Sequence, residues 1–105
     1  MTHLVVLSTV SSRREARRLA DLLLTKRVAA CINISSPVES RYWWKGKKEK
    51  AEEFLLLIKT TAPAFGKLEK LLRENHSYAS PEIIALPVTR GTRKYLAWLD
   101  REIRG

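Results

Sequence analysis

One stretch of the sequence, residues 28–60, decides the fold. It begins as Val28-Ala-Ala-Cys-Ile-Asn-Ile34, continues after a Ser-Ser-Pro break as Val38-Glu-Ser-Arg-Tyr-Trp-Trp44, and returns as Lys50-Ala-Glu-Glu-Phe-Leu-Leu-Leu-Ile-Lys-Thr60. β-Branched and aromatic residues that flank a glycine-containing turn, here Lys45-Gly46-Lys47-Lys48, are typical of a β-hairpin. The sequence therefore predicts one long hairpin in the middle of the chain.

This predicted hairpin is longer than a small domain is wide. Residues 28–44 would span roughly 55 Å at about 3.3 Å per residue, whereas a chain of this size has a radius of gyration of about 13 Å. We therefore expect the hairpin to bend at Pro37 and to overhang its own domain. An overhanging tip that carries Tyr42, Trp43 and Trp44 needs a partner surface, so we expect an oligomer with these aromatic side chains in its interface.

The elements on either side of the hairpin complete a βαββαβ order with an extra C-terminal helix. We predict strands over residues 4–7 and 82–86, the second stopped by Pro87, and helices over 13–26, from about residue 62, and after Gly91. Ser12 and Glu15 have the spacing of a capping box, in which the hydroxyl accepts from the Glu15 N–H and the carboxylate reaches back. This order predicts an α+β fold, a ferredoxin-like sandwich of one domain, residues 1–105, with both main helices on one face of an antiparallel sheet.

The composition limits the classes of partner that fit the chain. Its 20 Lys and Arg residues against 11 Asp and Glu produce a net charge of +9, which permits a polyanion such as nucleic acid. The basic residues are scattered along the chain, so we favour a solvated, charge-rich surface over a nucleic-acid partner. A composition with 30% charged residues and no Gln resembles that of thermophile proteins.

Other features bear on the compartment. No window approaches the roughly 20 apolar residues that span a bilayer, and the N-terminal residues do not resemble a secretory leader. Cys31 is the single cysteine and cannot form an internal disulfide. These features predict a cytoplasmic protein without a membrane span.

A small group of side chains could bind a metal ion. His76, Tyr78 and Glu82 fall within seven residues, and an imidazole with a carboxylate suits a divalent transition metal. A thiolate from Cys31 would favour copper or zinc. The alternative is structural: His76 would bond a backbone carbonyl, and Cys31 would be an inert core residue. We recognise neither a nucleophile–base pair nor a glycine-rich phosphate loop, so we expect no enzymatic activity.

Taken together, these segments resemble the CutA family of divalent-cation tolerance proteins over essentially the whole chain. The motifs that carry the resemblance are Ala29-Ala-Cys-Ile-Asn-Ile34, Ser40-Arg-Tyr-Trp-Trp-Lys-Gly-Lys47, Leu57-Ile-Lys-Thr60, His76-Ser-Tyr-Ala-Ser-Pro-Glu-Ile-Ile-Ala-Leu-Pro87, and Tyr95-Leu-Ala-Trp98 after Gly91. Five motifs in the family's order make a specific match.

The resemblance implies a tight homotrimer built by the long hairpins, and a role in tolerance to metals, copper above all. It also implies metal ligands at Cys31, His76 and Glu82 around a cleft between subunits, and no established reaction. This chain departs from the family where some members carry a cysteine at the position of Ser8, and many a second histidine at that of Asn75. The similarity of the trimer to PII signalling proteins leaves an alternative, a sensor of an anionic small molecule whose cleft uses Lys59, Arg41 and Tyr78.

Overall fold

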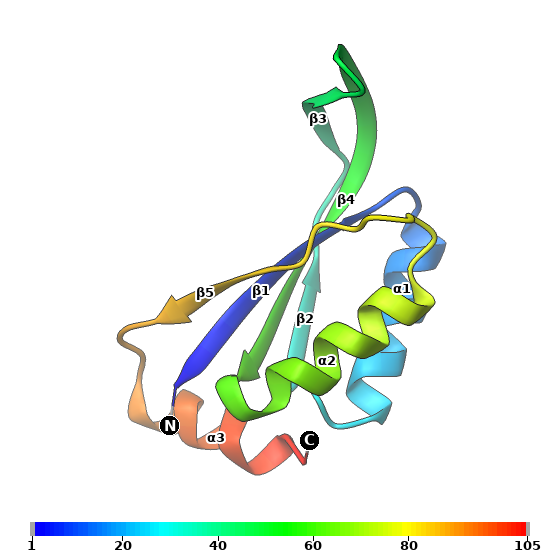
Figure 1. Ribbon diagram of the computed structural model, residues 1–105. Coiled ribbons are helices and arrows are strands. Elements are labelled where there is room, and N and C mark those ends of the chain that lie inside the picture. The colour runs from blue at the N-terminus through cyan, green and yellow to red at the C-terminus, as the bar shows by residue number, and fades with distance from the viewer. Residues whose placement is uncertain (1, 105) are drawn as a thin grey trace.

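A five-stranded antiparallel sheet with two helices against one of its faces forms the body of the protein, in a computed structural model that describes residues 2–104 (Figure 1). The elements in chain order are β1 (His3–Val10), α1 (Arg13–Thr25), β2 (Cys31–Ile34), β3 (Val38–Trp44), β4 (Lys47–Thr61), α2 (Ala62–Asn75), β5 (Ile84–Val88) and α3 (Arg93–Glu102).

The sheet order is β2-β4-β1-β5, and β3 pairs with the distal part of β4. The two short strands β2 and β3 together occupy the place of one strand in the βαββαβ pattern, interrupted at residues 35–37. The predicted fold class, α+β and ferredoxin-like with an extra C-terminal helix, is therefore confirmed. Figure 1 shows α1 and α2 side by side on the same face of the sheet, as expected.

The hairpin overhangs the domain and breaks before β3, as the sequence predicts. The molecule is 44 Å long against 26 and 23 Å in the other directions, and the distal hairpin accounts for the long axis in Figure 1. Its turn is tighter than expected, because only Lys45 and Gly46 connect the paired residues Trp44 and Lys47. Both turn residues have positive φ, 50° and 78°, which is the geometry of a two-residue type I′ turn.

Alternate residues of the central strands build the core. Val6 and Val10 of β1 and Leu56 and Ile58 of β4 point toward the helices and are fully buried. They pack in one cluster with apolar side chains of α1 and α2, namely Ala16, Leu19, Leu23, Leu68 and Leu72. Burial of this stripe, at about 25 cal/mol per Å² of apolar surface, is the main source of stability for the two-layer arrangement.

The expectation that Pro87 stops the last strand is wrong. β5 runs from Ile84 to Val88, and Pro87 pairs with Leu4 inside it. β5 is an edge strand that pairs only with β1 among the described strands. Proline is tolerated on an edge, because a residue there has no second neighbour that needs its N–H.

The second face of the sheet is left largely open. Its two cross-strand rows are Leu86, Val5, Lys59, Cys31 and Ile84, Leu7, Leu57, Asn33. Ile84 and Leu86 are each 51% exposed, and the other aliphatic side chains of the rows are half-buried. α3 lies at one end of the sheet, tied by a hydrogen bond of 2.8 Å between His3 Nε2 and Asp100 Oδ1. Within residues 2–104, no helix has the length and apolar character needed to cross a membrane.

Candidate functional site

The three predicted metal ligands lie in different parts of the subunit. Cys31 begins β2, His76 directly follows α2, and Glu82 is exposed ahead of β5. The His76 ring contacts the carbonyl of Thr9, and Thr9 pairs with β4 four residues from the partner of Cys31. Four residues correspond to roughly 13 Å along the strand. Across the described residues, no three His, Cys, Asp or Glu side chains are grouped closely enough to hold a metal ion.

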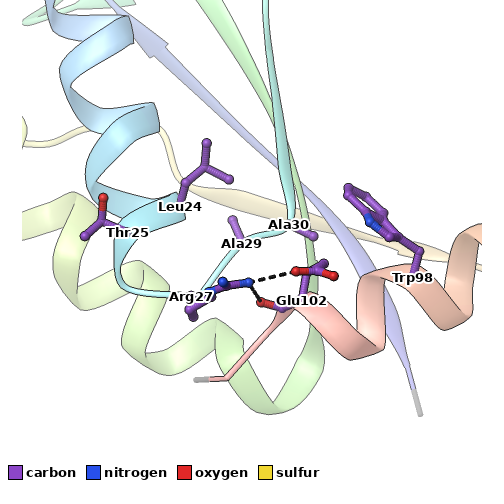
Figure 2. A pocket seen from close by; sticks show the side chains of 7 residues that line it. All are labelled: Leu24, Thr25, Arg27, Ala29, Ala30, Trp98 and Glu102. Atoms are coloured by element: carbon purple, nitrogen blue, oxygen red, sulfur yellow. Dashed lines mark hydrogen bonds and ion pairs between the residues drawn. The ribbon is translucent and has the colours of Figure 1, made fainter.

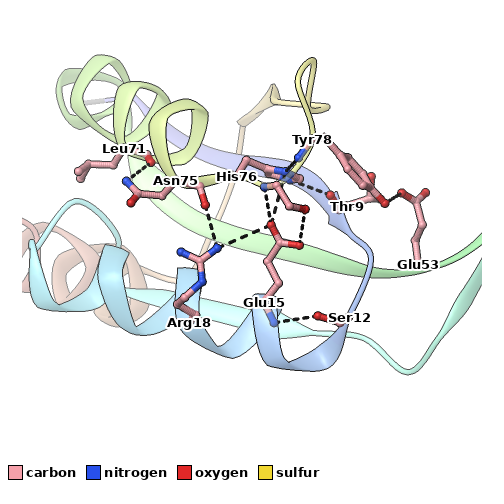
Figure 3. Close-up of polar contacts among 10 residues, drawn as sticks. Thr9, Ser12, Glu15, Arg18, Glu53, Leu71, Asn75, His76 and Tyr78 are labelled. Carbon is pink, nitrogen blue, oxygen red and sulfur yellow. Dashed lines mark hydrogen bonds and ion pairs between the residues drawn. The ribbon is translucent and has the colours of Figure 1, made fainter.

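His76 is enclosed by backbone partners (Figure 3). Its side chain is fully buried. Nε2 lies 2.9 Å from the carbonyl oxygen of Thr9, and Nδ1 accepts a hydrogen bond of 3.0 Å from the N–H of Tyr78. These partners fit a neutral imidazole that donates from Nε2 and accepts at Nδ1. A metal ion at either nitrogen would have to displace a backbone group, so this geometry favours the structural alternative for His76.

Glu15, one of the buried carboxylates, holds the segment that follows α2. It accepts hydrogen bonds from both the N–H and the hydroxyl of Ser77, each at 2.8 Å. Burial raises the pKa of Glu15, but the two hydrogen bonds from Ser77, together with the electrostatic effects of the neighbouring His76 and Arg18, outweigh burial and hold this pKa below its usual range. The capping box is thus half confirmed: Ser12 Oγ accepts from the Glu15 N–H at 3.1 Å, while the carboxylate turns to Ser77.

Tyr78 connects the same segment to the base of the hairpin. Its hydroxyl donates to Glu53 Oε2 at 2.7 Å, and its ring packs against His76 with centroids 4.9 Å apart. Burial raises the pKa of Tyr78, and the hydrogen bond to the Glu53 carboxylate raises it further. We call Glu15, Glu53, His76, Ser77 and Tyr78 the loop network. It joins α1, β4 and the α2–β5 connection.

Sequence reasoning missed the two acidic members of the loop network. The capping spacing explains Glu15 without any long-range partner, and Glu53 follows a run of charged residues that reads as solvated. Sequence reasoning also missed the open apolar face of the sheet, although one feature of the sequence indicates it. Residues 54–58 form a continuous apolar run, which is typical of a strand that is covered on both faces.

Cys31 lies on the open face, at the end where α3 packs. Lys59 is its cross-strand neighbour, and the ammonium of Lys59 bonds the side-chain oxygen of Asn33 on the same face. Tyr95 of α3 reaches the thiol. Burial raises the pKa of Tyr95, and its contact and hydrogen bond with Cys31 add to the effect. Cys31 is half-buried and is not part of the helix-facing core.

The residues expected in an anion cleft do not meet within one subunit. Tyr78 contacts Glu53, which is six residues from Lys59 along β4, or roughly 20 Å. Arg41 lies farther out on the hairpin, where its side chain is 71% exposed and pairs with Glu39 at 2.6 Å. A single cleft that uses all three predicted residues would need more than one subunit.

The aromatic tip of the hairpin is exposed in the single subunit. Tyr42, Trp43 and Trp44 are 44%, 68% and 52% exposed. Lys48 lies over the ring of Trp43 at 5.7 Å from its centroid, and Lys45 over Trp44 at 5.9 Å. Cation–π contacts of this kind orient the indoles weakly and leave most of their surface in solvent.

Comparisons with known proteins agree with the fold. The family described as CutA1 divalent ion tolerance protein matches residues 4–102. The divalent-cation tolerance protein CutA of Thermus thermophilus is 47% identical over 95 residues, which cover 90% of this chain and 92% of that protein. Its counterpart in Archaeoglobus fulgidus is 40% identical over 101 residues, which cover 96% and 98%.

Solved structures lead to the same family. The Thermus thermophilus protein superposes with a TM-score of 0.94 at 44% identity and covers 96% of this chain and 98% of that one. CutA1 from Oryza sativa superposes with a TM-score of 0.96 at 40% identity, over 99% and 95%. With its sequence match over nearly the full length and its superposition on these structures, the chain belongs to the CutA1 divalent ion tolerance family.

Proposed function

We propose that this chain acts as a non-enzymatic, homotrimeric binding protein in tolerance to divalent metal ions. The observation that carries the proposal is the open face of the sheet. Leu7, Leu57, Ile84 and Leu86 form a contiguous apolar surface that neither main helix covers. Apolar patches of this kind on a folded domain mark protein interfaces, and copies of the same chain are the occupant we propose.

The overhanging hairpin supports a ring of subunits over a two-fold dimer. The distal hairpin extends beyond the body of its own subunit, so in this proposal its tip would contact a surface of the neighbour other than the neighbour's own tip. Such head-to-tail contacts close into rings when the rotation between subunits permits. Three subunits agree with what the resemblance to the family implies, and Tyr42, Trp43 and Trp44 would then be buried at the interface.

Sedimentation equilibrium and native mass spectrometry test the assembly. The wild-type chain is expected at three times the subunit mass, and Leu57→Glu in the middle of the open face is expected to yield monomer. Leu24→Glu is the matched control, because Leu24 is 41% exposed on α1, away from that face. If Leu57→Glu does not fold, Leu86→Lys serves in its place. A monomeric wild type contradicts the proposal. A trimer that persists in the folded open-face variant, Leu57→Glu or its replacement Leu86→Lys, contradicts it as well.

The metal part of the proposal needs more than one subunit. Cys31, His76 and Glu82 do not fit one metal centre within a single chain, because they lie apart and both nitrogens of His76 are engaged. We propose that copper or another divalent ion contacts the assembly at Cys31, close to the subunit boundary. The same lone thiol is the basis for proposing the reducing cytoplasm as the compartment.

Calorimetric titration with Cu²⁺ and Zn²⁺ tests the metal site. Saturable binding is expected in the wild type and is expected to weaken at least about tenfold in Cys31→Ser, because the soft ligand is lost. Zn²⁺ separates coordination from thiol oxidation by Cu²⁺, since zinc is redox-inert. The same titration of Glu82→Gln shows whether the exposed Glu82 carboxylate takes part in metal binding. Equal binding in Cys31→Ser and wild type would remove Cys31 from the site.

A further inference from the structure

A pocket that has no part in the predicted sites lies where α3 meets the loop between α1 and β2. Its volume is about 570 Å³, within the usual range for small-molecule sites. Leu24, Ala29 and Ala30 line it on one side, and Trp98 and Glu102 of α3 on the other. Figure 2 shows Arg27 extending from the loop toward Glu102, with Trp98 rising from α3 beside the same space.

Arg27 occupies a backbone position at which glycine is the usual residue. It follows α1 with φ of 58°. The Val28 N–H bonds the Leu23 carbonyl at 3.2 Å, and the Arg27 N–H bonds the Leu24 carbonyl at 3.0 Å, the two bonds of a Schellman motif. Glycine is preferred there because a Cβ makes the left-handed conformation unfavourable. An arginine at this position is therefore expected to be retained for its side chain.

The Arg27 side chain spans the pocket and holds the end of α3. Nη1 donates to the side-chain Oε1 of Glu102 at 2.8 Å and to the Glu102 carbonyl at 3.3 Å. The Arg104 N–H donates to the Arg27 carbonyl at 2.8 Å. Among the described residues, the hydrogen bonds of this guanidinium all come from Nη1, so its other N–H groups are free to face a ligand. Tyr95 packs on the Trp98 indole at 5.6 Å between centroids and orients it.

The lining selects a particular ligand chemistry. One carboxylate without thiol or imidazole is a poor donor set for a transition metal. Glu102 neutralises Arg27, so the pocket carries no net charge that would attract a bare anion. The remaining features of the lining are the aromatic side chain of Trp98, the donor groups of Arg27 and the acceptor oxygens of Glu102. A flat ring stacks on an indole, a guanidinium donates to ring oxygen or nitrogen atoms, and a carboxylate accepts from an amine or amide N–H.

We propose that this pocket binds a neutral planar heterocycle with the hydrogen-bonding edge of a nucleobase, stacked on Trp98 and bonded to Arg27 and Glu102. Guanine is the best match, because its edges present N–H donors for the carboxylate and acceptors for the guanidinium. The pocket adjoins Cys31, which follows Ala30 in the chain and contacts Tyr95. None of its lining residues belongs to the two open-face rows or to the proposed metal ligands, so substitutions at Trp98 and Glu102 test this site separately from the assembly and metal proposals.

Guanosine titrations followed by NMR test the site on the ¹⁵N-labelled full chain. The indole N–H resonance of Trp98, assigned by its loss in Trp98→Phe, is expected to shift in a saturable way with guanosine. Uridine, which lacks an exocyclic amine, is expected to bind more weakly. Trp98→Leu is expected to weaken guanosine binding about tenfold or more through lost stacking. Glu74→Gln, a carboxylate-to-amide change at an exposed position of α2 outside the pocket, is expected to leave the affinity unchanged.

Glu102→Gln separates recognition from fold stability. The Glu102 carbonyl still bonds Arg27 in this variant, so α3 is expected to stay docked while guanosine binding falls several-fold. A Trp98 resonance that guanosine does not move at millimolar concentration overturns the proposal. Equal affinities of wild type and Glu102→Gln overturn it as well, because they would indicate unspecific stacking. A resonance that guanosine moves only after the assembly is dissociated shows a pocket covered by a neighbouring subunit, and also overturns it.

Discussion

Glu15 and Ser77 are 62 residues apart in the chain and are joined by two hydrogen bonds of 2.8 Å, in which the backbone N–H and the hydroxyl of Ser77 both donate to one carboxylate. Glu15 is 7% exposed. A charged, bidentate acceptor in a buried position is a strong hydrogen-bond partner for the backbone of a loop. This pair therefore fixes where the chain runs between α2 and β5.

The substitution Glu15→Gln is expected to lower the free energy of unfolding by about 1–3 kcal/mol. The amide can accept only at its oxygen and carries no charge, so one of the two Ser77 donors loses its charged partner. Urea denaturation at pH 7 and a fixed protein concentration measures the loss. Glu74→Gln, the same change at an exposed position of α2, is the control and is expected to be neutral. Equal stability of the two variants would contradict a structural role for the pair.

Stability is expected to fall in acid partly through Glu15. Its pKa is lower in the folded protein than in the unfolded chain, so its contribution is fully present above the unfolded value of about 4.3. That contribution is lost as pH falls through the lower folded pKa. Denaturation from pH 7 to pH 3 checks this: the stability gap between wild type and Glu15→Gln should narrow as the pH falls. If the stability difference between wild type and Glu15→Gln stays constant with pH, protonation of Glu15 is not coupled to unfolding.

Ser8 is expected to be a site where a smaller, apolar side chain stabilises the protein. It is fully buried on the helix-facing side of β1, and its hydroxyl has no hydrogen-bond partner among the described residues. Removing an unsatisfied buried hydroxyl is worth about 1 kcal/mol. Ser8→Ala should therefore raise the denaturation midpoint, while Ser11→Ala, at an exposed position, should not. A less stable Ser8→Ala variant would reveal a partner for the hydroxyl.

Arg27 allows backbone strain to be separated from the ion pair. The Arg27–Glu102 pair is about half exposed, and such pairs contribute about 0–1 kcal/mol. Arg27→Ala loses the pair and keeps the strained φ, so it is expected to be less stable than wild type. Arg27→Gly loses the pair but relieves the strain, and should exceed Arg27→Ala by about 1 kcal/mol. Thermal and urea unfolding of the two variants provide the comparison, and equal stability would show that φ at this position carries no strain.

Local chemistry made the elements readable from the sequence. The helical spacing of Leu19 and Leu23 places α1, and the Lys45-Gly46 pair at the tip produces the type I′ turn. Both depend on a few neighbouring residues, because helical period and turn conformation are properties of short segments. The error in the predicted end of β5 also arises because the prediction considered only neighbouring residues. Pro87 ends a strand in most settings, and only its place on the sheet edge makes it acceptable inside β5.

The sequence by itself determined the order of elements, the overhanging hairpin and the family, since each depends on periodicity, turn residues and motifs along the chain. Only the tertiary structure decided which side chains meet. It enclosed His76 between Thr9 and Tyr78 and turned the Glu15 carboxylate to Ser77. It left Cys31 on the open face, at a distance from His76 along the sheet. The physical reason is that such contacts depend on strand register and on the face to which each residue points, and a one-residue change in register would reverse every one of those faces.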